Sequence, residues 1–141
     1  MNVFVDTNIF LDSCRDRSSG FNPTNEFAFQ FFKQAIECKF YVLICKEIVF
    51  ELMNATKLTE KDVFKIILNE INQANKLILI EHSKIQLNEA ISLAKTRKIP
   101  LTDCLLAVLA RDNNTFVVTR DNHFLEELVE IVEVKTPEEL L

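Results

Sequence analysis

Short apolar runs along this chain alternate with longer segments in which apolar residues recur every three or four positions. The short runs cover residues 2–5, 40–45 and 115–119, and each predicts a buried strand. Residues 77–81 predict either a further strand or an extended connector. Helical spacing appears over residues 26–37, 46–57, 59–74, 83–96 and 104–111.

Short strands separated by helices of about ten or more residues indicate a parallel sheet with both faces covered. Residues 14–25 hold the only Gly and several small polar residues, which favours a surface loop. Pro100 interrupts the helical pattern, and Thr102 is available to cap the helix that follows. A last helical turn is expected at Thr136 and Pro137. No repeat or linker interrupts this pattern, so we expect one α/β domain over residues 1–141.

The composition, with 48% hydrophobic and 26% charged residues, is that of an ordinary globular protein. A single Gly excludes the glycine-rich phosphate loops, which need several. The net charge of −5 argues against coating nucleic acid by bulk positive potential, but not against a nuclease whose metal ion supplies that charge.

The four Cys include no CxxC pair and the chain has two His, so a zinc site is not indicated. The first residues resemble no signal peptide, and no apolar run reaches the length of a membrane span. We expect a cytoplasmic protein with reduced thiols and no membrane partner.

Four acidic residues stand in places that single them out. Asp6 and Asp121 each follow a predicted strand, where functional groups of parallel sheets collect, although each could simply cap the next helix. Glu51 is surrounded by apolar residues, so its carboxylate is costly there unless it is paired or the helix is rotated toward water. Asp103 lies at the start of an otherwise apolar helix, and its carboxylate could simply stabilise the first turn of that helix. Glu47 looks like a solvated charge.

Together the four acids indicate a metal site. Like charges 4 Å apart repel by about 4 kcal/mol per pair at an effective dielectric near 20, so a converging cluster needs a multivalent cation unless it is protonated. Ligation by oxygen alone selects Mg²⁺ or Mn²⁺ over zinc.

The segments around these acids resemble the signature segments of the PIN-domain ribonuclease family, in the family's order and spacing: VFVDTNIFLD, EIVFELMNA, IPLTDCLLAVLA and FVVTRDNHFLEEL. That family includes the VapC-like toxins of toxin–antitoxin pairs, and the similarity extends over nearly the whole chain. It implies a three-layer α/β/α domain with a mainly parallel sheet. It also implies hydrolysis of single-stranded RNA with Mg²⁺ or Mn²⁺, and an antitoxin partner.

The resemblance assigns the four catalytic and metal-binding positions to Asp6, Glu51, Asp103 and Asp121. Asp6 and Asp103 are expected as direct ligands, followed by Asp121, whereas Glu51 could act through water. The polar neighbours Asn8 and Thr119 match positions that orient a ligand or a water. Some relatives carry a further acid after the fourth, where this chain has Asn122 and His123. His123 is also open to interpretation as a proton donor or as a surface or packing residue.

Basic residues near three of the acids are candidates for holding RNA, with ordinary solvated charges as the alternative: Arg15, Arg17, Lys95, Arg97, Lys98 and Arg120. A phosphatase of the haloacid-dehalogenase type is disfavoured, because it needs a carboxylate where Asn8 stands. The competing function is a catalytically weak PIN module that binds RNA or protein.

Segment 26–38 carries Phe27, Phe29, Phe31 and Phe32, which cannot share one helix face. Unless connecting segments cover it, part of this surface predicts an interface. The family resemblance suggests a homodimer or an antitoxin contact that uses Phe29 or Phe32.

Overall fold

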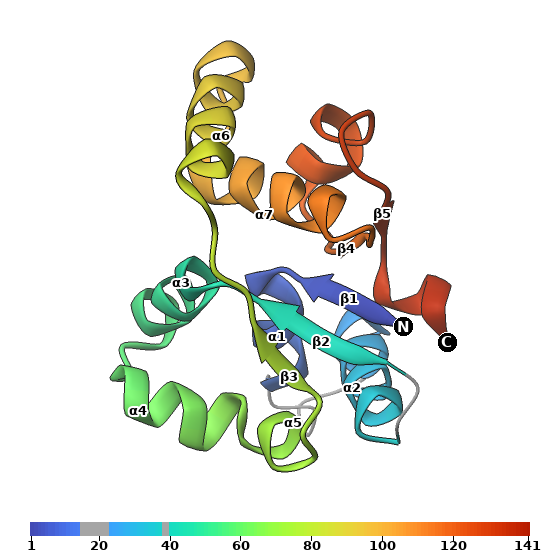
Figure 1. Cartoon of the computed structure of the whole chain (residues 1–141). Coiled ribbons are helices and arrows are strands. Elements are labelled where there is room, and N and C mark those ends of the chain that lie inside the picture. The colour runs from blue at the N-terminus through green and yellow to red at the C-terminus, as the bar shows by residue number, and fades with distance from the viewer. Residues whose placement is uncertain (15–22, 38–39) are drawn as a thin grey trace.

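The computed structural model describes residues 1–14, 23–37 and 40–141. Most of the predicted loop at residues 14–25, with Arg15 and Arg17, lies outside these ranges. The strands of the described residues form one five-stranded parallel sheet in the order β3-β2-β1-β4-β5 (Figure 1). Their bounds are β1 (Asn2–Val5), β2 (Tyr41–Ile44), β3 (Leu77–Leu79), β4 (Val117–Val118) and β5 (Val134–Lys135).

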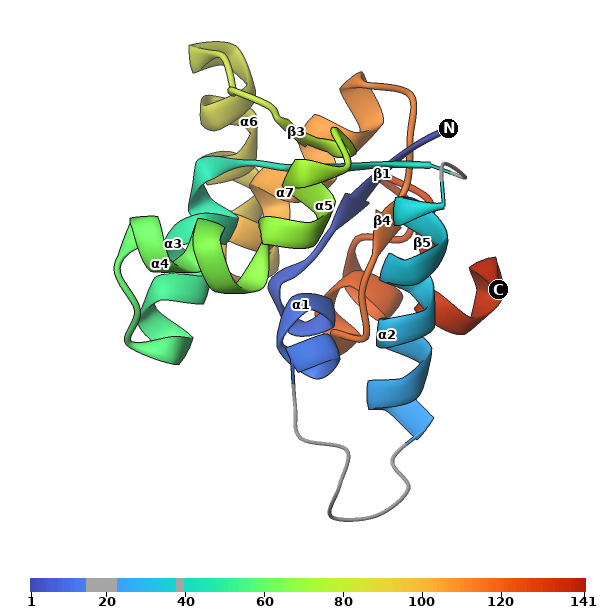
Figure 2. The same cartoon turned by 90° about the horizontal axis from the view of Figure 1, so that it is seen from below.

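Helices cover both faces of this sheet. They are α1 (Thr7–Cys14), α2 (Pro23–Ile36), α3 (Lys46–Thr56), α4 (Glu60–Asp62), α5 (Asn69–Gln73), α6 (Lys84–Arg97) and α7 (Leu101–Asp112), with π-helical turns η1 (Val63–Ile67) and η2 (His123–Glu127) and a final 3-10 turn η3 (Pro137–Leu140). α6 and α7 lie on one side, and α1, α2 and α5 lie on the other (Figures 1 and 2). The predicted α/β/α architecture with a parallel sheet is confirmed, and the sheet is parallel throughout.

Apolar strands and aromatic side chains build the core between these layers. Val3, Phe4 and Val5 of the central strand are fully buried, as is most of α7. Phe10 and Phe32 stack with ring centroids 4.9 Å apart and so join α1 to α2. The packing of α7 against β1 and β4 holds the first turn of α7 near the carboxyl end of the central strand. No helix in the described ranges has the length and apolar character needed to cross a bilayer.

Side-chain hydrogen bonds stabilise the starts of several helices that the sequence predicts. The Thr59 hydroxyl accepts a hydrogen bond from Asp62 N (3.3 Å) and caps α4. Ser83 caps α6 through a reciprocal pair of hydrogen bonds with Gln86. At the start of η3, the backbone N–H and the hydroxyl of Thr136 both donate to Glu139 Oε2 (2.6 and 3.2 Å). The run at residues 77–81 resolves into strand β3, which pairs with β2.

Three local predictions are wrong. Thr102 does not cap its helix, because Pro100 occupies the N-cap position and α7 begins at Leu101. The helical spacing of apolar residues over 59–74 predicts Ile66 on the buried face, but Ile66 is 63% exposed, because the π-helical turn η1 changes the angular spacing of successive residues. The strand predicted over residues 115–119 is reduced to two residues, the length over which β4 pairs with β1 and β5.

Candidate metal-binding active site

The four predicted acids line one open pocket at the carboxyl ends of the central strands. Val5 of β1 pairs with Val118 of β4, so the segments that follow these strands, carrying Asp6 and Asp121, lie side by side. α3 brings Glu51 to the pocket, and α7 brings Asp103 in its first turn. The pocket has a volume of about 370 Å³, and its lining also includes Thr7, Asn8, Leu11, Asn54 and Ala55.

The buried hydroxyl of Thr119 connects two of these acids. It donates to Asp6 Oδ2 (2.8 Å) and accepts hydrogen bonds from Asn8 Nδ2 (3.2 Å) and from the backbone N–H of Asp121 (3.0 Å). The other oxygen of Asp6, Oδ1, accepts from the backbone N–H of Thr7 (2.8 Å). Asp6 is therefore held in one orientation, with Asn8 and Thr119 as its supports.

Burial and mutual repulsion disfavour the charged forms of three carboxyl groups. Burial, then the negative charges of Asp6 and Asp103, raise the pKa of Glu51 to about 7, against a weaker opposing interaction with the Thr7 hydroxyl. Burial, then Asp6 and Asp121, raise the pKa of Asp103 to about 6. Burial also raises the pKa of Asp6, although hydrogen bonds from Thr119 and Thr7 oppose that rise.

This environment fits a divalent cation. Glu51 Oε1 and Thr7 Oγ1 are buried, and neither has a hydrogen-bond partner of ordinary geometry among the described residues. Such orphaned oxygens are costly unless another group satisfies them. A hard cation would do so and would offset both the burial and the repulsion that raise the pKa values, and carboxylates are the ligands that such ions prefer.

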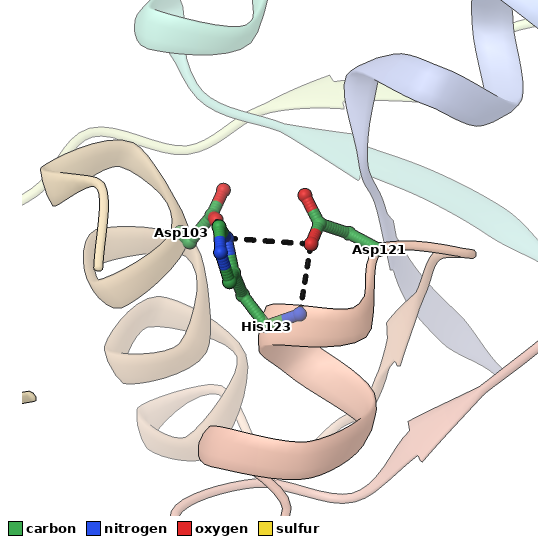
Figure 3. A group of neighbouring side chains, drawn as sticks. All are labelled: Asp103, Asp121 and His123. Atoms are coloured by element: carbon green, nitrogen blue, oxygen red, sulfur yellow. Dashed lines mark hydrogen bonds and ion pairs between the residues drawn. The ribbon is translucent and has the colours of Figure 1, made fainter. Parts of the chain in front are cut away.

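Asp103, Asp121 and His123 form one group beside the pocket, in which one potential ligand atom from each residue lies within 4.8 Å of the other two (Figure 3). His123 Nδ1 lies 3.3 Å from Asp103 Oδ2 and 3.4 Å from Asp121 Oδ1. Asp121 Oδ1 also accepts the backbone N–H of His123 (2.8 Å), so the predicted capping role and a place in the pocket coexist in one residue.

The basic residues proposed from the sequence lie in different environments. Arg120 makes a bidentate ion pair with the Glu138 carboxylate (3.0 and 2.6 Å), and its Nε atom lies 3.8 Å from Asp12 Oδ2. Arg97 is bonded to the Glu127 carbonyl and the Glu130 carboxylate. Both arginines therefore anchor the C-terminal segments instead of facing the pocket as open cations. Lys95 and Lys98 are exposed, and Arg15 and Arg17 fall outside the described ranges.

Two polar residues of the pocket lining, Thr7 and Asn54, are not among the residues predicted from the sequence. Asn54 follows Glu51 by three positions on α3, and this spacing places both on one helix face, which is the signal that could have identified it. Glu47 was misplaced as a solvated charge. Its side chain is 21% exposed and lies 3.0 Å from His82 Nε2, so it connects α3 to the segment that precedes α6.

The profile of the PIN domain family matches residues 3–126, and the chain belongs to this family. Many PIN domains are nucleases that use divalent metal ions. Membership therefore indicates a nuclease at the level of the family, and the acidic cluster is consistent with metal binding. No curated protein sequence is significantly similar to this chain.

Solved structures of toxin–antitoxin proteins are among those that share the fold. The chain is 17% identical to one in the VapBC2 complex from Rickettsia felis bound to a promoter DNA fragment, with a TM-score of 0.65 and coverage of 96% of this chain and 98% of that one. It is 21% identical to a chain of a toxin–antitoxin complex from Klebsiella pneumoniae (TM-score 0.61, coverage 96% and 97%). It is also 21% identical to a chain of FitAcB from Neisseria gonorrhoeae (TM-score 0.63, coverage 96% and 98%).

Proposed function

We propose that this chain is a metal-dependent endoribonuclease that hydrolyses phosphodiester bonds of single-stranded RNA. The observation that carries the proposal is the convergence of four carboxylates from four separate segments in one open pocket. Three of them have raised pKa values, because they are buried and lie close to other carboxyl groups. Membership of the PIN family supports the nuclease class.

In this proposal Asp6, Asp103 and Asp121 hold Mg²⁺ or Mn²⁺ directly, and Glu51 contributes through water. The bound ion would supply Lewis acidity that stabilises charge on the phosphodiester and makes a nearby water more nucleophilic. The chain's own contribution is positional, because the Thr119 hydroxyl orients the Asp6 carboxylate and the backbone of Asp121 at the same time.

The pocket lining contains no basic side chain among the described residues, so RNA contacts must come from its surroundings. We propose Lys95 and Lys98, which are exposed, as phosphate contacts, and retain Arg15 and Arg17 as sequence-based candidates. Arg97 and Arg120 are assigned to anchoring instead. Asn54, exposed at the edge of the pocket, offers an uncharged donor and acceptor to the substrate.

Cleavage of a labelled single-stranded RNA tests the activity. The wild-type protein is expected to cut it in Mn²⁺ or Mg²⁺ and to leave it intact in EDTA, with single-stranded DNA as the substrate control. Asp6→Asn and Asp103→Asn should abolish cutting, whereas Glu126→Gln, on the exposed side of η2, should not. RNA binding without metal-dependent cutting would instead identify a catalytically weak binding module.

We further propose that the chain acts in the cytoplasm as the toxin of a toxin–antitoxin pair. The support is the fold shared with chains of the VapBC2 complex and of the Klebsiella toxin–antitoxin complex. Induced expression without a partner should arrest growth, and the Asp6→Asn variant should not. Unaffected growth at equal protein levels would remove the toxin role while leaving the nuclease proposal intact.

The proposed homodimer or antitoxin interface uses α2. Phe29 is 39% exposed beside an apolar cavity of about 390 Å³ between α1, α2 and η1. Phe32, the other aromatic candidate, is only 7% exposed and packs on Phe10, so Phe29 is the better contact. Sedimentation should give a dimer of the 16.3 kDa chain that Phe29→Glu dissociates. A wild-type monomer would remove the self-association.

A further inference from the structure

His123 lies inside the acidic cluster, and none of the proposed roles above uses its side chain. Its Nδ1 atom faces both Asp103 Oδ2 (3.3 Å) and Asp121 Oδ1 (3.4 Å), as Figure 3 shows. The side chain is 46% exposed and that of Asp103 is 8% exposed, so the ring reaches from the surface to a buried carboxylate.

The backbone around His123 is fixed by short-range contacts. Asp121 Oδ1 accepts the N–H of His123, and the Asp121 carbonyl accepts the N–H groups of Phe124 and Leu125 (3.1 and 3.2 Å). Phe124 is fully buried in the core. The start of η2 is therefore anchored, and the imidazole is presented to the two carboxylates from a defined position.

The spacing of the three ligand atoms suits one shared ion. Two atoms bonded to the same ion at about 2.1 Å and at right angles lie about 3 Å apart. The two distances from His123 Nδ1 approach that separation, and all three ligand atoms lie within 4.8 Å of one another, so a closing movement of the side chains would bring them to one ion. We infer that His123 is a direct ligand of the ion in this pocket, and that the site therefore prefers a transition-metal ion such as Mn²⁺ over Mg²⁺.

The preference follows from the chemistry of the donor atoms. Mg²⁺ is a hard ion that takes oxygen ligands and retains waters, whereas imidazole nitrogen suits Zn, Cu, Fe and Ni. Mn²⁺ is the weakest binder of that row, but it accepts nitrogen more readily than Mg²⁺ does. A site of two carboxylates and one imidazole mixes oxygen and nitrogen ligands. Its ratio of Mn²⁺ affinity to Mg²⁺ affinity should therefore be higher than that of a site with oxygen ligands alone. Replacing the imidazole with a carboxylate should restore an all-oxygen site and reduce the preference.

This inference rests on the proposed metal-dependent function, so its test must separate the two. Pulsed EPR of the untagged protein with Mn²⁺ detects a coordinated nitrogen directly. The chain has two His, and His82 lies against Glu47, where neither residue lines the pocket. Wild-type protein should show ¹⁴N coupling that becomes ¹⁵N coupling when the histidines are ¹⁵N-labelled. His123→Asp should lose the coupling, and the matched control His82→Gln should retain it.

Metal affinities measured by calorimetry provide the second readout. The ratio of Mn²⁺ affinity to Mg²⁺ affinity should fall at least about tenfold in His123→Asp and stay unchanged in His82→Gln. Circular dichroism checks that both variants fold. If Mn²⁺ binds the wild type without histidine nitrogen coupling, His123 is no ligand and the inference fails, while the metal-dependent function stands. If no Mn²⁺ binds at millimolar concentration, both fail.

Discussion

Neutralising Glu51 should stabilise the metal-free protein while impairing its metal site. Its pKa rises from an ordinary value of 4.5 to about 7 because of burial and the charges of Asp6 and Asp103. One unit of pKa corresponds to about 1.4 kcal/mol, so the ionised group costs at most about 3 kcal/mol. The side chain is partly exposed and its neighbours titrate with it, which reduces the expected cost to about 1–2 kcal/mol.

The direction with pH follows from linkage. Below pH 4.5 the carboxyl group of Glu51 is mostly protonated in the folded and unfolded chains alike, so it carries no charge penalty. As pH rises through about 7, the folded chain must hold the charge, and the stability associated with the protonated group is lost. Glu51→Gln removes this loss. Its advantage should therefore be complete near pH 8 and mostly gone at pH 5.

Thermal unfolding in EDTA measures the effect. For a chain of this length, about 1–2 kcal/mol corresponds to a Tm increase of about 3–7 °C at pH 8. Glu81→Gln, at an exposed position, is the matched control and should change Tm by little. Saturating Mn²⁺ should reverse the order, because it stabilises the variant less than the wild type. An equal gain at pH 5 and pH 8, or a loss at pH 8, would refute the electrostatic reasoning.

Three further changes test the supports of the site. Thr119→Val removes a buried hydroxyl with three hydrogen-bond partners, so urea unfolding should show a free energy of unfolding lower by about 2–3 kcal/mol, and RNA cleavage should slow. Thr119→Ser should recover both, and a Val variant equal to wild type would contradict this role. Arg120→Met leaves Glu138 without its ion pair and should lower the free energy of unfolding by about 1–3 kcal/mol, with no change in the salt dependence of RNA binding. If the slope of log affinity against log salt concentration falls by about 1 and stability is unchanged, Arg120 is a phosphate contact. Glu47→Ala deprives His82 of its partner and should lower stability by about 1–2 kcal/mol, while the RNA cleavage rate of the folded protein stays within about twofold of wild type. Equal losses of activity in variants of Glu47 and of the pocket acids would place Glu47 in the site.

Features that depend on neighbouring residues were predictable from the sequence. The apolar run at residues 2–5 is β1, and helical spacing after residue 45 gives α3 within one residue of its observed end. Capping by Thr59 follows from a hydroxyl group that reaches the backbone N–H of Asp62, three residues on. The positions of Asp6 and Asp121 after strands also follow, since parallel strands present their carboxyl ends at one edge of a sheet.

Tertiary structure decided which charged groups are available to the site. Arg120 looked like an RNA contact beside Asp121, yet Glu138, far from the pocket acids along the chain, binds it. Glu47 looked solvated because its partner, His82, lies 35 residues away. The orientation of His123 toward Asp103 likewise depends on the packing of η2 against α7. Local periodicity contains no information on such pairs, because long-range packing brings the partners together, and a side chain's charge is then satisfied by whichever group the fold places beside it.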